Sequence, residues 1–406
     1  MKSLAIHGGT PVRKTPIYYG HQSIDDDDIA AVEQVLRSDY LTCGPAVTQL
    51  EEKLCNITGA EHAVAVSSGT AALHAACYAA GIKSGDEVIT TPLTFAASAN
   101  CILYMGATPI FADVDLETYN IDPESIEAHI SERTRAILAV DFTGQAVELQ
   151  KIRTICKKNR ILLIEDGAHS IGTVYKNLYV GNIADLTTFS FHPVKTVTGG
   201  EGGAILTNNA KYYQRVSLFR THGITRNVKL MNLKLDGKNT YDGLEEWYYQ
   251  QIDLGYNYRI TDIQAALIRS QLDKLEQFKL RRQKIADMYN KAFTDFPGII
   301  LQKEIQESDT ARHIYLIQLD LDKLTVGRKE VFDALKAEKV YCNVHYIPIY
   351  YFPYYQKLGY TKGLCPNAER LYERLITIPL YPAMTDGDVD SVITAIKKVI
   401  RFYLKG

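Results

Sequence analysis

The stretch Ile161-Leu-Leu-Ile-Glu-Asp-Gly-Ala-His-Ser170 carries the clearest information about the fold. Four consecutive apolar residues are typical of a strand buried on both faces, as in parallel sheets covered by helices. The strand closes with two acids, Glu165 and Asp166. In open α/β sheets, ligands bind beyond the carboxyl ends of the strands, so Asp166 is expected to face a ligand and a cationic partner. The alternative is an acid that only caps the following turn.

Further short apolar runs alternate with helical patterns from about residue 60 to residue 206. Such alternation predicts an α/β chain with a mostly parallel sheet that helices cover on both faces. The seven expected strands are residues 63–66, 87–90, 108–112, 136–140, 161–164, 186–190 and 203–206.

The length and the later pattern predict two domains. A chain of 406 residues exceeds what one simple hydrophobic core organises. A charged amphipathic stretch, residues 263–293, is expected to form a single helix that links the domains. The expected parts are an irregular arm (1–24), a large domain (25–262) and the linking helix with a smaller α+β domain (263–406). The elements expected in the small domain are strands at 314–319 and 340–344 and a last helix at 388–404.

The composition is that of an ordinary globular protein. Hydrophobic residues at 46%, charged residues at 23% and a net charge of -2 exclude disordered and strongly basic classes, so no nucleic-acid partner is expected. No apolar run approaches the ~18 residues of a membrane span, and the first residues lack the apolar core of a signal peptide. The seven cysteines are widely spread without a C-x-x-C pair, which argues against zinc and favours reduced thiols. A cytoplasmic protein without membrane contact or metal is expected.

A second informative segment is Ser67-Ser-Gly-Thr70, where an apolar run ends and a helix-favouring run begins. Backbone N–H groups at a helix N-terminus bind anions, and glycine lets a ligand approach closely. The segment therefore predicts a phosphate site. The alternative is that its hydroxyls only cap the helix.

A third segment, Ser190-Phe-His-Pro-Val-Lys-Thr-Val-Thr-Gly-Gly-Glu-Gly-Gly203, places Lys195 shortly after an expected strand. Most lysines are surface charges. However, Pro193 disfavours a helix here, and the glycine run permits close backbone approach. Burial beside a cofactor would lower the pKa of the amine, and a neutral amine can form an imine and act as a base. The glycine run leads into a strand instead of a helix, so a nucleotide-binding Rossmann motif is disfavoured.

These three segments, in this order, resemble the fold-type I pyridoxal-phosphate enzymes, in particular the sugar aminotransferases of the DegT/DnrJ/EryC1/StrS family. The resemblance covers about residues 20 to 404. It implies that Lys195 carries pyridoxal 5′-phosphate as a Schiff base and acts as the catalytic acid and base, while Asp166 pairs with the pyridine nitrogen. It further implies cofactor contacts by Gly69, Thr70 and Ser190 with the phosphate, by His169 with the ring hydroxyl, and by Ala168 and Phe95 with the two ring faces.

A fourth segment, Gly255-Tyr-Asn-Tyr-Arg-Ile-Thr-Asp-Ile-Gln-Ala-Ala-Leu267, is a further signature of the family. In that family the residue matching Asn257 reaches the cofactor phosphate of the neighbouring subunit. The resemblance therefore implies a homodimer with two shared sites.

The resemblance also implies a reaction, transfer of an amino group from L-glutamate to a keto-sugar. Related proteins that dehydrate their sugar have a histidine at the lysine position, so Lys195 favours transamination. The segments 190–203 and 246–257 look most like those of enzymes that aminate C4 of UDP-linked 4-keto-6-deoxy hexoses in pseudaminic acid-type biosynthesis. The alternatives are another nucleotide-sugar aminotransferase, such as the 4-amino-arabinose lipid A type, another fold-type I activity, or a regulator or scaffold without catalysis.

The expected substrate contacts are Tyr19, Arg226, Arg259, His345 and Tyr346. Phenols and imidazoles suit a hydroxyl-rich sugar ring, and a guanidinium forks well onto diphosphate oxygens. The alternatives are aromatic packing for the first group and interface ion pairs for the arginines. The polar segment 225–243 is expected to form a mobile loop near the mouth of the site.

Overall fold

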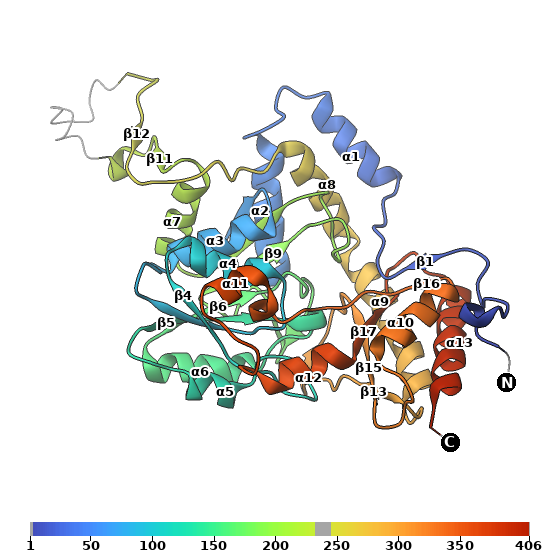
Figure 1. Cartoon of the computed structure of the whole chain (residues 1–406). Helices are drawn as coiled ribbons and strands as arrows, with labels where there is room; N and C mark the ends of the chain where they lie inside the picture. The colour runs from blue at the N-terminus through green and yellow to red at the C-terminus, as the bar shows by residue number, and fades with distance from the viewer. Residues whose placement is uncertain (1–2, 232–244, 406) are drawn as a thin grey trace.

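The structure is a computed structural model that describes residues 3–231 and 245–405. Figure 1 shows a larger body around a central sheet and a smaller body that holds both ends of the chain. Within the described ranges, no helix has the length and apolar character needed to cross a membrane.

The central sheet is the framework of the larger body, and in the described residues it has the seven predicted strands. Their order is β2-β10-β9-β6-β5-β3-β4. All neighbours run parallel except β10, which is antiparallel to both β2 and β9. The strands are β2 (His62–Val66), β3 (Glu87–Thr90), β4 (Thr108–Phe111), β5 (Thr134–Val140), β6 (Leu162–Asp166), β9 (Leu186–Ser190) and β10 (Gly203–Thr207). The predicted α/β fold with a mostly parallel sheet is confirmed.

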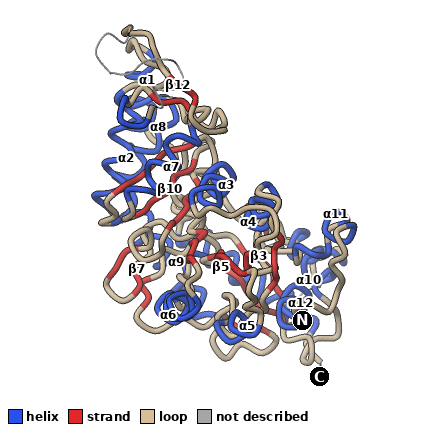
Figure 2. The backbone as a smooth tube through the Cα atoms, turned by 90° about the vertical axis from the view of Figure 1, so that its left-hand side faces the viewer, coloured by secondary structure: helices blue, strands red, loops and turns tan. Residues whose placement is uncertain are grey.

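Helices cover both faces of this sheet (Figure 2). Along β5, Ala136, Leu138 and Val140 pack with α3, α4 and α7, whereas Ile137 and Ala139 pack with α2, α6 and α8 on the opposite face. Successive side chains of a strand point to opposite faces, so burial of both faces explains the continuous apolar runs in the sequence. The helices of this body are α1 (Asp26–Leu36), α2 (Pro45–Thr58), α3 (Gly69–Ala79), α4 (Ala96–Tyr104), α5 (Pro123–Ala128), α6 (Leu149–Asn159), α7 (Ala210–Arg220) and α8 (Asp262–Asp273).

Short elements fill the connections of the larger body. They are η2 (Phe142–Gly144), β7 (Val174–Tyr175), β8 (Leu178–Tyr179), β11 (Ile224–Thr225), η3 (Val228–Leu230) and β12 (Gln250–Gln251). Of the loop predicted over residues 225–243, residues 232–243 lie outside the described part of the chain.

The predicted linking helix, residues 263–293, is two helices and not one. α8 ends at Asp273, and α9 (Leu275–Phe293) begins after Lys274, whose backbone leaves helical geometry at ψ 3°. Lys274 Nζ lies 2.6 Å from Asp25 Oδ1 and 2.7 Å from Asp28 Oδ2, at the start of α1. The amphipathic pattern runs across this break because both helices bury a face, so the pattern does not reveal the break.

The smaller body has its own core, built from the second half of α9 and the C-terminal elements. A three-stranded antiparallel sheet, β13-β15-β17, lies against helices. The predicted strand at 314–319 is β15, the strand expected at 340–344 is shortened to β16, and the last helix is confirmed. The C-terminal part of the chain contains β13 (Ile299–Leu301), β14 (Ser308–Asp309), β15 (Tyr315–Leu319), α10 (Arg328–Ala337), β16 (Val340–Tyr341), η5 (Ile349–Tyr351), α11 (Pro353–Lys357), α12 (Pro366–Arg374), β17 (Leu375–Ile378) and α13 (Asp386–Tyr403). Of these, β14 pairs with β7, and η5, α11 and α12 pack against the larger body.

The N-terminal arm lies on the smaller body. It was expected to be irregular throughout, but its described residues contain two short regular elements. After η1 (Ala5–His7), residues of β1 (Ile17–Tyr18) pair in parallel with β16. The buried carboxylate of Glu338 accepts from the backbone N–H groups of Ala5 at 2.9 Å and Val12 at 2.8 Å, which ties the arm down. The arm therefore carries the next residue, Tyr19, to a defined place. The division at residues 24 and 262 stays a prediction.

The sheet brings the predicted chemical segments to one edge. Because β2, β5, β6 and β9 run in the same direction, their carboxyl ends meet there, and the reversed β10 begins there at Gly203. A Cβ atom at Gly203 would lie 2.4 Å from the backbone oxygen of Ser68 and 2.8 Å from the nitrogen of Gly69. A glycine is therefore required where β10 meets the turn after β2.

The Gly203→Ala substitution is expected to destabilise the cofactor-free protein by ~1–3 kcal/mol, because the added methyl group collides with backbone that cannot move freely. The measurement is the urea denaturation midpoint. Gly387→Ala is the control, because its new Cβ would meet only Thr385 Oγ1, at 3.8 Å, near the start of α13. That control should be neutral or slightly stabilising. Equal midpoints for the two variants would contradict the packing described here.

Candidate active site

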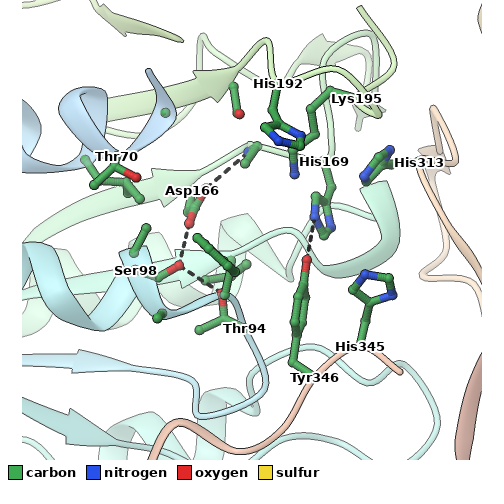
Figure 3. Close-up of a pocket in the computed structure, with 18 of the residues that line it drawn as sticks. Thr70, Thr94, Ser98, Asp166, His169, His192, Lys195, His313, His345 and Tyr346 are labelled. Atoms are coloured by element: carbon green, nitrogen blue, oxygen red, sulfur yellow. Dashed lines mark hydrogen bonds between the residues drawn. The ribbon is translucent and has the colours of Figure 1, made fainter. Parts of the chain in front are cut away.

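A cavity of about 950 Å³ lies at the carboxyl edge of the sheet. Its volume is at the upper end of the range for small-molecule sites, so it can hold a cofactor and a substrate together. Most of the predicted site residues line it, from both bodies of the chain (Figure 3). These residues are Tyr19, Gly69, Thr70, Phe95, Asp166, Ala168, His169, Ser190, Lys195, His345 and Tyr346.

The N-terminus of α3 forms one end of the cavity. Ser68 is the N-cap residue, and its Oγ accepts from the backbone N–H of Ala71 at 3.1 Å. The N–H groups of Gly69 and Thr70 precede the first intrahelical hydrogen bond, so they can bind an anion. Capping and a phosphate site were alternatives in the sequence, and here the cap leaves the anion-binding groups available.

Close packing fixes Ser190 beside this helix end. A Cβ atom at Gly69 would lie 2.8 Å from the Cβ of Ser190 and 3.0 Å from its Oγ. Only a glycine allows the end of β9 to approach the first turn of α3 this closely. The arrangement brings a hydroxyl next to the free N–H groups, as a phosphate site requires.

Asp166 stands buried at the end of β6. Ser98 Oγ donates to Asp166 Oδ2 at 2.7 Å, and the backbone N–H of Ala168 donates to Oδ1 at 3.1 Å. Burial raises the pKa of Asp166, while these two donors and the charge of Lys195 lower it in part. A cation or a protonated ring nitrogen in the cavity would stabilise the ionised carboxylate further.

Lys195 is half-buried in the loop after β9, as its position in the sequence predicted. Its backbone N–H donates to the carbonyl of His192 at 3.0 Å, which closes a turn and aims the side chain at the cavity (Figure 3). Burial lowers the pKa of Lys195 to about 8, and attraction to Asp166 opposes the change. At pH 7 roughly a tenth of the molecules thus have the neutral amine, the form that attacks a carbonyl carbon, which is far more than for a lysine with its usual pKa.

His169 lies between Asp166 and the smaller body. Its Nε2 shares a hydrogen bond of 3.2 Å with the hydroxyl of Tyr346. Its buried Nδ1 has no hydrogen-bond partner among the described residues. Burial lowers the pKa of His169, as do the nearby Lys195 and His345, so the ring is neutral and can donate or accept one further hydrogen bond.

Two more histidines of the smaller body line the cavity. His313 packs against His169 with ring centroids 4.5 Å apart, and its buried Nδ1 has no partner in the described chain. His345 shares a hydrogen bond of 2.7 Å through Nδ1 with Thr377 Oγ1, and its ring centroid lies 5.3 Å from that of Tyr19. Burial lowers the pKa of His345 to about 4, so it is a neutral donor or acceptor.

Three predicted residues do not line this cavity. Arg226, after β11, and Asn257 are exposed, and Arg259 is half-buried. Asn257 forms an isolated antiparallel bridge with Thr221, on the side of the larger body where β11 and β12 lie. Their expected contacts with cofactor or substrate therefore stay predictions that require a second copy of the chain.

Sequence reasoning missed Ser98, Thr94 and His313. Ser98 follows Thr94 by four residues across the start of α4, and that spacing of two hydroxyls was the signal available. His313 precedes β15 in the other body, and nothing local marks it as a neighbour of His169.

The cavity fits pyridoxal 5′-phosphate, the cofactor implied by the sequence resemblance. A phosphate suits the first turn of α3, a protonated ring nitrogen suits the buried Asp166, and an aldehyde suits the amine of Lys195. The unpartnered Nδ1 of His169 suits the ring hydroxyl. Each of these four parts of the site thus has a complementary chemical group in one small molecule.

Comparisons with known proteins agree with this geometry. The model of the DegT/DnrJ/EryC1/StrS aminotransferase family matches residues 22–397. The spore coat polysaccharide biosynthesis protein SpsC of Bacillus subtilis is 40% identical over 385 residues, which are 94% of this chain and 97% of that protein.

Solved structures lead in the same direction. Helicobacter pylori PseC, an aminotransferase involved in the biosynthesis of pseudoaminic acid, superposes with a TM-score of 0.88 at 31% identity, covering 96% of this chain and 100% of that chain. A Streptococcus pneumoniae protein solved in its PLP-form has a TM-score of 0.86 at 28% identity, covering 96% of this chain and 100% of that chain. The cofactor is pyridoxal 5′-phosphate, and the fold is that of these aminotransferases.

Amine-directed acylation of the cofactor-free protein should modify Lys195 with a pH midpoint near 8, because only the neutral amine reacts and its pKa is lowered to about 8. Peptide mass spectrometry after a short pulse of reagent at each pH measures the modified fraction, with exposed lysines of the same digest as references. The Asp166→Asn variant should shift the midpoint to lower pH, because Asp166 raises the pKa of Lys195. A midpoint above pH 10, or no response to Asp166→Asn, would contradict the electrostatics described.

Proposed function

The chain belongs to the DegT/DnrJ/EryC1/StrS family of sugar aminotransferases, and on that premise we propose that it moves an amino group from L-glutamate to C4 of a UDP-linked 4-keto-6-deoxy hexose. The observation that carries the proposal is the pairing of Lys195 and Asp166 across one cavity. The cavity also has room and hydrogen-bonding groups for a sugar. The product would be an amino sugar of the pseudaminic acid type.

Lys195 would hold the cofactor through Nζ and would move a proton at the substrate carbon. When bound, pyridoxal phosphate supplies an electron sink for the charge that develops on that carbon. An acid and base catalyst works best when its pKa is near the working pH, and the pKa of Lys195, lowered to about 8, meets this condition.

Asp166 and His169 would orient the ring. Asp166 would face the ring nitrogen and favour its protonated state, because the buried carboxylate gains a cationic partner. His169 would hold the ring hydroxyl with its free Nδ1, since Tyr346 already engages Nε2 at 3.2 Å. The hydroxyls of Thr70 and Ser190 would join the N–H groups of α3 around the phosphate.

The sugar would lie between the cofactor and the groups of the smaller body. Tyr19 and His345 stand together at that wall, with His345 oriented by Thr377. Neutral phenols and imidazoles hydrogen-bond sugar hydroxyls without the desolvation cost of a charge. The likeness to PseC, an aminotransferase involved in the biosynthesis of pseudoaminic acid, supports a substrate of that type.

A second copy of the chain would complete the site. Among the described residues that line the cavity, the cationic or titratable nitrogen groups are one lysine and four histidines, with no arginine. A diphosphate is best bound by guanidinium groups. We therefore propose a homodimer in which Asn257 reaches the partner's cofactor phosphate and Arg226 or Arg259 meets the diphosphate.

The purified protein should aminate a UDP-linked 4-keto-6-deoxy hexose with L-glutamate as donor. The measurement incubates it with glutamate and a panel of UDP-linked 4-keto sugars, and identifies products by mass and NMR. A 4-keto arabinose derivative and a free amino acid acceptor serve as comparisons. Turnover restricted to either comparison would contradict the proposed substrate while leaving the aminotransferase class intact.

Lys195→Ala should lower turnover by at least ~10³-fold, because the variant lacks both the covalent anchor and the proton carrier. Borohydride treatment followed by peptide mapping should place the reduced cofactor on residue 195 in the unchanged protein and nowhere in the variant. Lys211→Ala, which removes an exposed lysine in the first turn of α7 that does not line the cavity, is the matched control and should retain activity. Activity of Lys195→Ala near that of the control would make the assignment wrong.

A further inference from the structure

We propose that Ser98 is a positioning residue, whose hydroxyl holds the Asp166 carboxylate ionised and correctly turned toward the cofactor's ring nitrogen. The inference rests on the proposed role of Asp166 and extends it to Ser98, which lines the same cavity and would act on the cofactor through that carboxylate. Thr94 supports Ser98 in the same chain of hydrogen bonds (Figure 3).

The contact between Ser98 and Asp166 is short and buried. Ser98 Oγ donates to Asp166 Oδ2 at 2.7 Å, and the two side chains are only 1% and 4% exposed. The Ala168 N–H holds the other oxygen at 3.1 Å. A carboxylate has about four lone-pair positions, so two donors fix its plane and leave positions open toward the cavity.

The direction of the hydrogen bonds follows from the number of hydrogens. A serine hydroxyl has one hydrogen, and an ionised carboxylate only accepts, so the hydrogen of Ser98 points to Asp166. Ser98 Oγ lies 2.8 Å from Thr94 Oγ1, and the Thr94 hydroxyl must therefore be the donor of that bond. Such a chain strengthens each member, because Thr94 polarises the hydroxyl that serves Asp166.

Helix α4 gives this support its rigidity. Ser98 lies in the first turn, and its backbone N–H donates to the carbonyl of Phe95 at 3.2 Å. Phe95 lines the cavity from the N-cap position of the same turn. The first turn of α4 would thus place the ring of Phe95 at one face of the cofactor and the hydroxyl of Ser98 behind Asp166, the proposed partner of the ring nitrogen.

The hydroxyl also acts on the charge of Asp166. Burial alone favours the protonated acid, which could not pair with a protonated ring nitrogen. Ser98 and Ala168 both oppose that effect, because hydrogen bonds to a carboxylate stabilise its ionised form. Loss of the Ser98 hydroxyl should therefore weaken cofactor binding and alter its titration, in addition to any change in stability.

The test compares three variants of the full-length protein, and its first readout is the dissociation constant of pyridoxal phosphate. Ser98→Ala should raise that constant about tenfold, the loss expected for one hydrogen bond to a charged group. Thr94→Val should raise it about twofold to threefold, because Ser98 keeps its own bond. Ser98→Thr, which keeps the hydroxyl, should restore affinity to within about threefold of the unchanged protein.

Thr187→Val is the matched control. Thr187 Oγ1 donates to the side chain of the buried Glu165, the residue before Asp166, at 2.8 Å. This variant therefore also removes a buried hydrogen bond from a hydroxyl to a carboxyl group. Neither Thr187 nor Glu165 lines the cavity in the described chain. The control should change the denaturation midpoint without changing the dissociation constant of the cofactor.

A second readout separates positioning from structure. With the accepted keto-sugar, Ser98→Ala should lower kcat about tenfold and leave the KM for the sugar within about twofold, and the pH dependence of the bound cofactor's visible spectrum should shift. Equal dissociation constants and spectra for Ser98→Ala and Thr187→Val would overturn the proposal. Cofactor affinity tests the role of Ser98 even if the protein aminates no sugar of the panel. Failure of the proposed substrate is therefore distinguishable from failure of the proposed role of Ser98.

Discussion

The candidate active site depends on the buried carboxylate of Asp166 at the end of β6. A carboxylate at 4% exposure is costly unless hydrogen bonds and a cation compensate for it. The chain supplies two donors, Ser98 and the Ala168 N–H, and places Lys195 nearby. A ring nitrogen that carries a proton would compensate for the rest of that cost, so we propose that the burial which raises the pKa of Asp166 also favours this cofactor.

The parallel sheet places this carboxylate beside the other predicted groups of the site. The strands β2, β6 and β9 end at one edge, which gathers a phosphate turn, an acid and a lysine from segments far apart in the sequence. The smaller body then closes the cavity with histidines and tyrosines, and the N-terminal arm adds Tyr19. The arm is held by Glu338 of the same body through the backbone N–H groups of Ala5 and Val12, which helps to position Tyr19 at the cavity.

The sequence could predict those site residues that lie close to the end of a strand. Asp166 and Lys195 each follow an apolar run, and the position of a ligand beyond parallel strands is a property of the fold. Ser98 could not be found this way, because its contact with Asp166 spans 68 residues and depends on how α4 packs. The break at Lys274 was also missed, and the ion pairs of Lys274 with Asp25 and Asp28 link this point to a segment far away in the sequence. His313 likewise comes to His169 only through the contact of the two bodies.

We propose that the carboxylate of Asp166 keeps the cofactor's ring nitrogen protonated. Nitrogen NMR of the protein loaded with pyridoxal phosphate labelled at that nitrogen tests it directly. We expect the nitrogen chemical shift of a protonated ring in the unchanged protein at neutral pH and that of a neutral ring in Asp166→Ala. The same shift in both proteins would contradict it.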